Sequence, residues 1–199
     1  DHKRIIFNGN GYDDAWIEEA TKERGLCNYR STPDVLPVFI EDKNVKLFTK
    51  HHIFTESEIN SRYEILLENY TKTLHIEAKT LVDMMYHQFL PAVSKYTDQV
   101  VTTAEKKKAF SSSISLKADT ALLEKLSAAY DELTDLTEEL KSEIAKAEGT
   151  TDELEAAKFY QATVLDTMGK IRVLADSVEE ILPEDVLPYP GYAKMLFYV

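Results

Sequence analysis

Apolar residues in the second half of the chain recur at alternating spacings of three and four, which is the period of an amphipathic helix. Two such stripes occupy about residues 116–182 and are separated by the short segment "EGTTDE". The first stripe is Leu123, Leu126, Tyr130, Leu133, Thr137, Leu140, Ile144 and Ala147; the second is Leu154, Ala157, Gln161, Val164, Met168, Ile171, Ala175, Val178 and Leu182. These are heptad a and d positions, and the short connection at Gly149 predicts an antiparallel αα-hairpin.

A longer helical pattern precedes this hairpin. The sequence "TESE" places Thr55 and Glu58 three residues apart as a capping box, which marks a helix start. The apolar residues that follow at helical spacing are Ile59, Tyr63, Leu66, Tyr70, Leu74, Leu81 and Met84. Pro91 is expected to kink or end this helix, although the pattern resumes to about Phe110, and "KAFSSSIS" at residues 108–115 breaks it. The narrow stripes of the hairpin require a third helix, which residues 55–95 supply.

The first 54 residues predict shorter elements. The pattern predicts a short extended segment at residues 3–7. It predicts one or two short helices over residues 32–51, broken near Pro37 and Asp42. The predicted fold is therefore all-α, with short helices, a long central helix and an antiparallel hairpin packed on it. We divide it into an N-terminal part, residues 1–54, and a helical bundle with an aromatic tail, residues 55–199.

The composition narrows the possible partners. The chain of 199 residues carries a net charge of -12, which argues against nucleic acid or an anionic membrane as a partner. No apolar stretch approaches the roughly 18 residues of a spanning helix, the N-terminus lacks a signal-peptide layout, and the single Cys27 rules out an internal disulfide. A cytoplasmic location is expected. The apolar tail residues, predicted to pack on the bundle or on another domain, are Tyr189, Tyr192, Phe197 and Tyr198.

The segment "FNGNGYDDAW" at residues 7–16 raises the possibility of a phosphate-binding loop. Gly9 and Gly11 match the first two glycines of a dinucleotide fingerprint, but Asp14 stands at the third position and would repel a phosphate. We therefore interpret the segment as a turn, with Asn10 tolerating a left-handed conformation. Asp13 or Asp14 then caps a helix, which Gly25 ends.

No catalytic, cofactor-binding or metal-binding residue is assigned from the remaining sequence. The adjacent His51 and His52 point in different directions and seldom share a metal ion. His75, Glu77, Asp83 and His87 lie along one helix, but the Glu-x-x-His motif of a di-iron bundle is missing. Cys27 has no histidine placed by a motif. The seam residues Thr137 and Gln161 are expected to fix helix register, and the tyrosines, including Tyr63, Tyr70 and Tyr130, to supply core mass.

Three blocks of sequence resemble a known family. They are "HKRIIFNGNGYDDAWIEEATKERGL" at residues 2–26, "NVKLFTKHHIFTESEINSRYEILLENYTKTLHIEAKT" at residues 44–80, and "PYPGYAKMLFYV" at residues 188–199. In this order they resemble the C-terminal region of type III glutamine synthetases, the long-chain bacterial form of the enzyme. The resemblance extends over essentially the whole chain and is weakest in residues 97–160, where only the helical pattern matches.

The resemblance implies a parent enzyme, a glutamate–ammonia ligase that uses ATP and Mg²⁺ and forms a γ-glutamyl phosphate. The family's catalytic signatures belong to a barrel domain upstream of this region, and none of them occurs here. We therefore expect a fragment that is inactive by itself. Its expected partners are the upstream catalytic domain and neighbouring subunits of a homo-oligomer built from stacked hexameric rings.

Two functions remain open at this stage. The chain is either a structural, oligomerisation or regulatory accessory domain of the enzyme, or an independent helical interaction module. In the second case the acidic outer face of the hairpin would contact a basic partner. The abrupt start of the chain without Met and the apolar residues near both ends favour the first interpretation.

Overall fold

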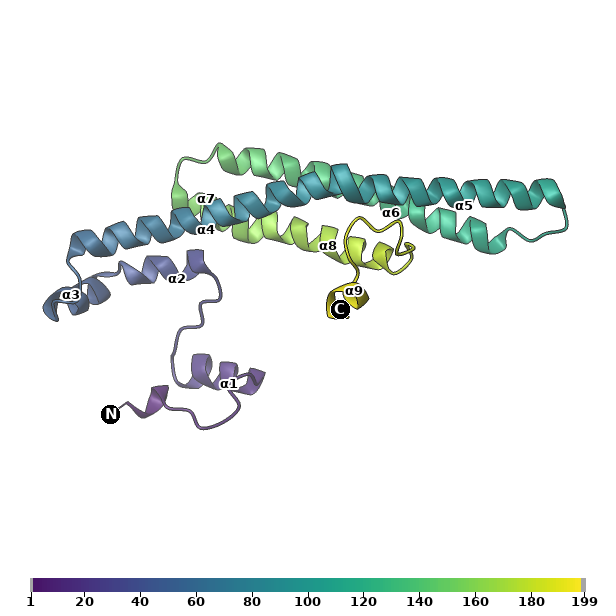
Figure 1. Cartoon of the computed structure of the whole chain (residues 1–199). Helices are drawn as coiled ribbons and strands as arrows, with labels where there is room; N and C mark the ends of the chain where they lie inside the picture. Colours follow the sequence, from purple (N-terminus) through teal and green to yellow (C-terminus); the bar gives the residue numbers. More distant parts are fainter. Residues whose placement is uncertain (1, 198–199) are drawn as a thin grey trace. The chain divides into compact units, whose positions relative to one another are not determined.

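The computed structural model describes residues 2–197, and this part of the chain contains helices and no strand (Figure 1). The chain forms two compact units, residues 1–67 and residues 68–199, and the long helix α4 (Glu56–Met84) runs through the division between them. The predicted boundary between residues 54 and 55 falls at the start of α4. The all-α fold class is confirmed.

The first unit consists of short helices, as its sequence predicts. Residues 3–7 are an exception, because Lys3–Ile5 form a 3₁₀ turn, η1, where we expected an extended segment. Pro37 does not break the chain either. It lies inside α2, which ends at Phe39, where the Asn44 side chain donates to the Val38 carbonyl at 2.6 Å. The elements that follow η1 are α1 (Asp14–Glu18), the wide π-helical turn η2 (Glu19–Glu23), α2 (Thr32–Phe39) and α3 (Asp42–Lys50).

An aromatic cluster holds together the part of this unit nearest α4. The ring of Phe48 lies between those of Phe39 and Phe54, with centroid distances of 5.6 and 5.7 Å. The Arg62 guanidinium lies 4.5 Å from the centroid of the Phe54 ring, in a cation–π contact. The cluster joins α2, α3 and the first turns of α4, so a short-helix segment acquires a small core of its own.

The second unit is a bundle of three helical stretches (Figure 1). The first runs through α4 into α5, α6 returns, and α7 continues into α8, so that consecutive stretches are antiparallel. The predicted hairpin is confirmed, with its turn at Gly149. The elements are η3 (Met85–Phe89), α5 (Leu90–Phe110), α6 (Lys117–Glu148), α7 (Glu153–Phe159), η4 (Tyr160–Val164), α8 (Leu165–Glu179) and α9 (Tyr192–Leu196).

The long first stretch begins and bends as the sequence predicts. The capping box is present, since the Glu58 carboxylate accepts from the Thr55 amide at 2.7 Å and the Thr55 hydroxyl accepts from the Glu58 amide at 3.3 Å. Pro91 neither ends the helix nor leaves it regular. In the preceding turn, η3, the Leu90 amide bonds to the Met85 carbonyl, five residues back. This wider turn accommodates the proline, which lacks an amide and would clash with the carbonyl of a normal turn.

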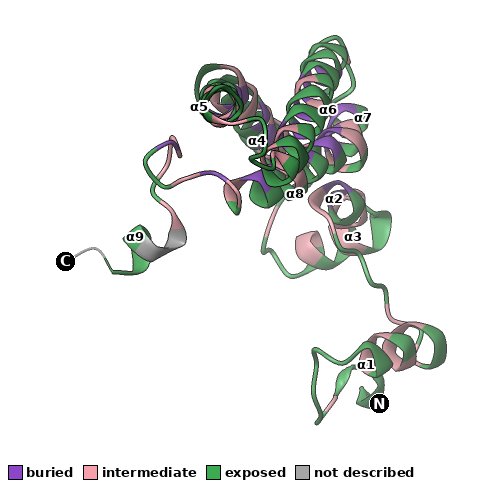
Figure 2. Ribbon diagram, turned by 90° about the vertical axis from the view of Figure 1, so that its right-hand side faces the viewer, coloured by how far each residue is buried: buried purple, intermediate pink, exposed green. Residues whose placement is uncertain are grey.

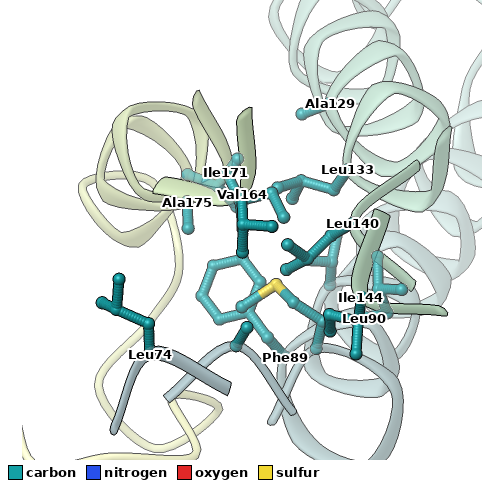
Figure 3. Close-up of a cluster of buried hydrophobic side chains, with 14 of the residues drawn as sticks. Leu74, Phe89, Leu90, Ala129, Leu133, Leu140, Ile144, Val164, Ile171 and Ala175 are labelled. Atoms are coloured by element: carbon teal, nitrogen blue, oxygen red, sulfur yellow. The ribbon is translucent and has the colours of Figure 1, made fainter. Parts of the chain in front are cut away.

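The core of the second unit lies where the three stretches face one another. Figure 2 shows buried positions along the facing sides of the bundle helices and exposed positions outside. Phe89, which is fully buried, lies among apolar side chains of all three stretches, including Leu140 and Val164 (Figure 3). Residues 74–93 supply the long helix's share of this core. The third helix that the hairpin requires is therefore present, as predicted.

The hairpin seams differ from the prediction at particular positions. In α6, Ala129 is buried and the predicted Tyr130 is exposed on the rim. In the last stretch Tyr160 and Thr167 are buried, while the predicted Gln161 and Met168 are only half-buried. The wide turn η4, in which the Leu165 amide bonds to the Tyr160 carbonyl, lies at this point of the helix. The buried positions Ala157, Tyr160, Val164 and Thr167 still follow spacings of three and four, so the heptad count took the neighbouring residue at two positions.

Polar seam residues and the tail complete the unit. Thr137 is fully buried and donates its hydroxyl to the Leu133 carbonyl at 2.6 Å.

In the tail, Tyr189 packs against the core as expected, whereas Phe197 is 78% exposed. The Tyr192 side chain and Tyr198, which we also expected to pack, lie outside the described residues.

Candidate functional site

The glycine-containing segment of the first unit is a turn followed by a helix cap. The Asn10 side chain accepts from the Tyr12 amide at 3.1 Å, and the Asp13 side chain caps α1 by accepting from the Ala15 amide at 3.0 Å. The expected left-handed conformation of Asn10 is wrong. In the described residues only His52 and Gly25 have positive φ, and the Gly25 φ of 62° fits its predicted role of ending a helix.

Gly9 leaves space for an aromatic ring, and reversal of the backbone is not the reason for a glycine here. A Cβ atom at this position would lie 2.6 Å from the Phe7 ring. That ring stacks on the indole of Trp16 with centroids 3.9 Å apart. The sequence did not reveal this stack, because it depends on how the turn folds back on α1.

Arg24 fixes this N-terminal region, and sequence reasoning missed it. Its guanidinium donates to the Ile6 carbonyl at 2.7 Å and to the Glu19 carboxylate at 2.8 Å, and lies 4.9 Å from the centroid of the Trp16 ring. The planar guanidinium makes these hydrogen bonds from two different nitrogens while its face lies near the ring, and a lysine has only one nitrogen for all of them. The segment therefore has a structural explanation and no feature of a phosphate site.

The histidines are dispersed. His51 and His52 follow the end of α3 and are exposed, and His87 pairs with Asp83 at 2.8 Å on the exposed side of the long helix. Among residues 2–197, no three His, Cys, Asp or Glu side chains are arranged so that they could hold a metal ion. Cys27 is an exposed free thiol.

His75 lies in a cleft of the second unit. This cleft, called here the His75 cleft, opens between one face of α4 and the turn that joins α6 to α7, and encloses about 440 Å³. Its lining residues are Glu68, Thr71, Lys72, His75, Ile76, Ala147, Glu148, Thr150, Glu153, Ala156 and Tyr160.

A chain of polar contacts crosses the cleft and joins the three helical stretches. The Tyr160 hydroxyl lies 2.8 Å from His75 Nδ1, and His75 Nε2 lies 3.5 Å from the Glu148 carboxylate. Lys79 Nζ approaches the same carboxylate oxygen at 3.4 Å. Burial raises the pKa of Tyr160, with the nearby Glu148 charge acting in the same direction.

The Tyr160 hydroxyl, the two ring nitrogens of His75 and the Glu148 carboxylate form one line of contacts. With the ring proton on Nε2, the Tyr160 hydroxyl donates to Nδ1 and the Nε2 proton points toward Glu148. The arrangement holds the Glu148 carboxylate at the edge of the cleft, and it can bind and orient a polar group.

Sequence reasoning identified only part of this site. His75 was noted among the polar residues of the long helix, but its partner Tyr160 is 85 positions away. Tyr160 also directly precedes Gln161, which the heptad count placed in the seam. Tyr160 is buried instead, at the start of the wide turn η4. Only the packing of α7 against α4 brings the two side chains together.

Fold and cleft together define a helical-bundle domain with a small polar cleft at one end. The chain belongs to the glutamine synthetase C-terminal domain family, whose sequence profile matches residues 1–108. The matched part comprises the first unit, α4, η3 and most of α5.

Curated relatives extend the similarity to nearly the whole chain. It is 42% identical over 196 residues to a glutamine synthetase of Butyrivibrio fibrisolvens, covering 98% of this chain and 28% of that protein. It is 30% identical over 203 residues to the type-3 glutamine synthetase of Dictyostelium discoideum, covering 98% and 27%. A glutamine synthetase of Bacteroides fragilis is 26% identical over 197 residues, covering 97% and 27%. The chain thus spans just over a quarter of these relatives' length. No helix within residues 2–197 has the length and apolar character to cross a membrane.

Proposed function

We propose that the chain serves as a helical accessory domain of a type III glutamine synthetase and contributes to the assembly or regulation of the enzyme. One observation carries the proposal: the relatives align with 98% of this chain, yet the alignment covers only 28% and 27% of their own lengths. The remainder of such a parent would contain the ligase chemistry. In the cytoplasm this parent would join ammonia to glutamate with ATP and Mg²⁺.

We propose that this chain itself binds none of the cofactors of that reaction. Residues 2–197 bring no three candidate metal ligands together, and the Gly9–Gly11 segment forms a helix cap with Asp13, without a phosphate-binding loop. We therefore assign no step of the ligase reaction to this chain. Its proposed contribution is made through surfaces.

Exposed apolar side chains near the N-terminus support contact with the rest of the parent. Tyr12 is 98% exposed, Ile5 64% and Ile6 58%. Leaving such residues in water is unfavourable, and clusters of them often mark interaction surfaces. We propose that they contact the catalytic domain or a neighbouring subunit in a homo-oligomer.

The test uses the full-length parent and the isolated chain. The isolated chain, given ATP, Mg²⁺, glutamate and ammonia, should form no glutamine above the level of buffer. In the parent, replacing Ile5, Ile6 and Tyr12 with serine should reduce the assembled mass measured by light scattering. Val173→Ser, at a position 72% exposed, is the matched control and should leave the mass unchanged.

Two outcomes would contradict the proposal. Glutamine synthesis by the isolated chain would show that the chemistry is present here. A parent without residues 116–182 that assembles and turns over normally, but no longer captures a basic partner protein, would favour the independent acidic interaction module.

A further inference from the structure

We propose that the His75 cleft binds a small organic cation, a protonated amine or guanidinium that carries a short apolar body. The inference concerns a ligand site within the second unit. It goes beyond the proposed accessory function and does not depend on it.

The cleft has the size and the floor of a small-molecule site. Its volume of about 440 Å³ lies within the range of roughly 300–1,000 Å³ that ligand pockets occupy. The floor is apolar, since Ala147, Ala156 and the ring of Tyr160 are buried there. Ile76, which is 64% exposed, forms an apolar flank. A ligand without an apolar part would leave this surface unused.

The side-chain charges favour a cation. Three carboxylates line the cleft, those of Glu68, Glu148 and Glu153, together with the single ammonium of Lys72 and the imidazole of His75. Lys72 is already paired with Glu68 at 2.5 Å. Lys79, outside the lining, approaches Glu148 at 3.4 Å. In the described part of the chain, no basic side chain forms an ion pair with Glu153. An excess of negative charge therefore remains.

The ends of the helices do not reverse this preference. The carboxyl end of α6 and the amino end of α7 both adjoin the cleft, and their dipoles have opposite signs. The two ends also have partners, since Thr150 donates to the Lys146 and Ala147 carbonyls and Asp152 caps α7. The dipole contributions therefore largely offset each other, and the carboxylates decide the sign.

The polar chain across the cleft positions the carboxylate of Glu148. Tyr160 orients the His75 ring, and His75 holds the Glu148 carboxylate at the rim at 3.5 Å. A ligand ammonium can join or replace the 3.4 Å contact that Lys79 makes with Glu148. Its apolar body then lies on the floor between Ile76 and Ala156.

The first experiment compares three probes with the same body and different charge. The ¹⁵N-labelled chain is titrated with benzylammonium, benzyl alcohol and benzoate near neutral pH, and amide shifts are followed by NMR. We expect benzylammonium to give saturable shifts confined to residues 68–76 and 147–160. Benzyl alcohol should bind about tenfold more weakly, and benzoate should not bind. Equal binding of the three probes, or shifts spread over the whole chain, would overturn the proposal.

Variants of the chain then distinguish the contribution of the carboxylate charge to probe binding from that of the apolar surface. Glu153→Gln should weaken benzylammonium binding severalfold and leave benzyl alcohol unchanged. Glu124→Gln, the same change at an exposed position near the opposite end of α6, should alter neither. Ile76→Ser should weaken both probes, whereas Val173→Ser should not. If Glu124→Gln weakens benzylammonium as much as Glu153→Gln, only the net charge matters and the site is refuted. Since no ligase assay is involved, this result would leave the accessory function untouched.

Discussion

Glu143 offers the sharpest test of the packing inside the hairpin. It lies on α6 with only 6% of its surface exposed. One carboxylate oxygen accepts from the Thr167 hydroxyl at 3.1 Å, and the other is buried without a hydrogen-bond partner. Burial raises the pKa of Glu143, although the Thr167 hydrogen bond lowers it. Glu143→Gln keeps the shape and the acceptor for Thr167 and removes the charge.

The direction of the shift determines the pH dependence. The pKa of Glu143 is raised in the native state from an ordinary value of 4.5. Below pH 4.5 the side chain is therefore protonated, and the native state buries it without a charge. As pH rises through the native pKa, the unfolded state releases the proton more readily and the native state loses stability. The loss from one group cannot exceed about 1.4 kcal/mol per pH unit. Removing the charge should therefore stabilise the protein most at high pH.

The size of the gain follows from the unpaired oxygen. Leaving a buried polar group unsatisfied costs about 1–3 kcal/mol. In Glu143→Gln the amide nitrogen takes the place of the unpaired oxygen, so part of this cost remains. We therefore expect a gain in the free energy of unfolding of about 1 kcal/mol at about pH 8, with a smaller gain at about pH 5.5.

Urea unfolding followed by circular dichroism, across this pH range, measures the difference between variant and wild type. The exposed Glu132→Gln is the control for the loss of one negative charge. A Glu143→Gln effect that does not change with pH would refute the reasoning, because a pH-independent gain cannot come from a titrating carboxylate. So would an effect equal to that of the control.

Three further predictions concern stability. Phe89→Ala should lower the free energy of unfolding by about 3–5 kcal/mol in urea, because Phe89 is fully buried, whereas Phe110→Ala, at a position 87% exposed, should change it little. Thr55→Ala should lower the free energy of unfolding by about 1 kcal/mol, because the cap on α4 is lost. Thr55→Ser should keep the cap and the stability; equal losses of stability in the two variants would argue against the capping box. Arg24→Lys should speed hydrogen exchange in residues 3–24 and leave the bundle unchanged, since a lysine lacks the separate nitrogens with which Arg24 bonds Ile6 and Glu19; unaltered exchange would show that the guanidinium contacts do not hold this segment.

Regular helix signals account for what the sequence predicted well. The Thr55 capping box, the break after Phe110 and the turn at Gly149 each rest on local chemistry, and the structure contains all three. The antiparallel hairpin followed because the a and d stripes are long and the connection is short. The resemblance to glutamine synthetases was carried by three sequence blocks, and the family match confirms it.

Two features of the helices were not predicted, the buried Tyr160 and the wide turns η3 and η4. Tyr160 takes the seam position expected for Gln161, although the buried positions keep spacings of three and four. The wide turns lie before Pro91 and at Tyr160. A sequence pattern assumes a constant number of residues per turn, so it cannot place a π-helical turn. Such turns are often found at functional sites, and η4 supplies the tyrosine of the His75 cleft.

The sequence by itself determined the helical class, the hairpin and the family, because periodicity, caps and short connections act between residues close in the chain. Only the tertiary structure decided which side chains meet across the bundle. His75 and Tyr160 are 85 positions apart, and Glu143 and Thr167 are 24 apart. Their contacts depend on the rotation of each helix about its axis, which is fixed by the packing of the apolar core as a whole. For this reason the candidate cleft emerged from the fold and not from any motif.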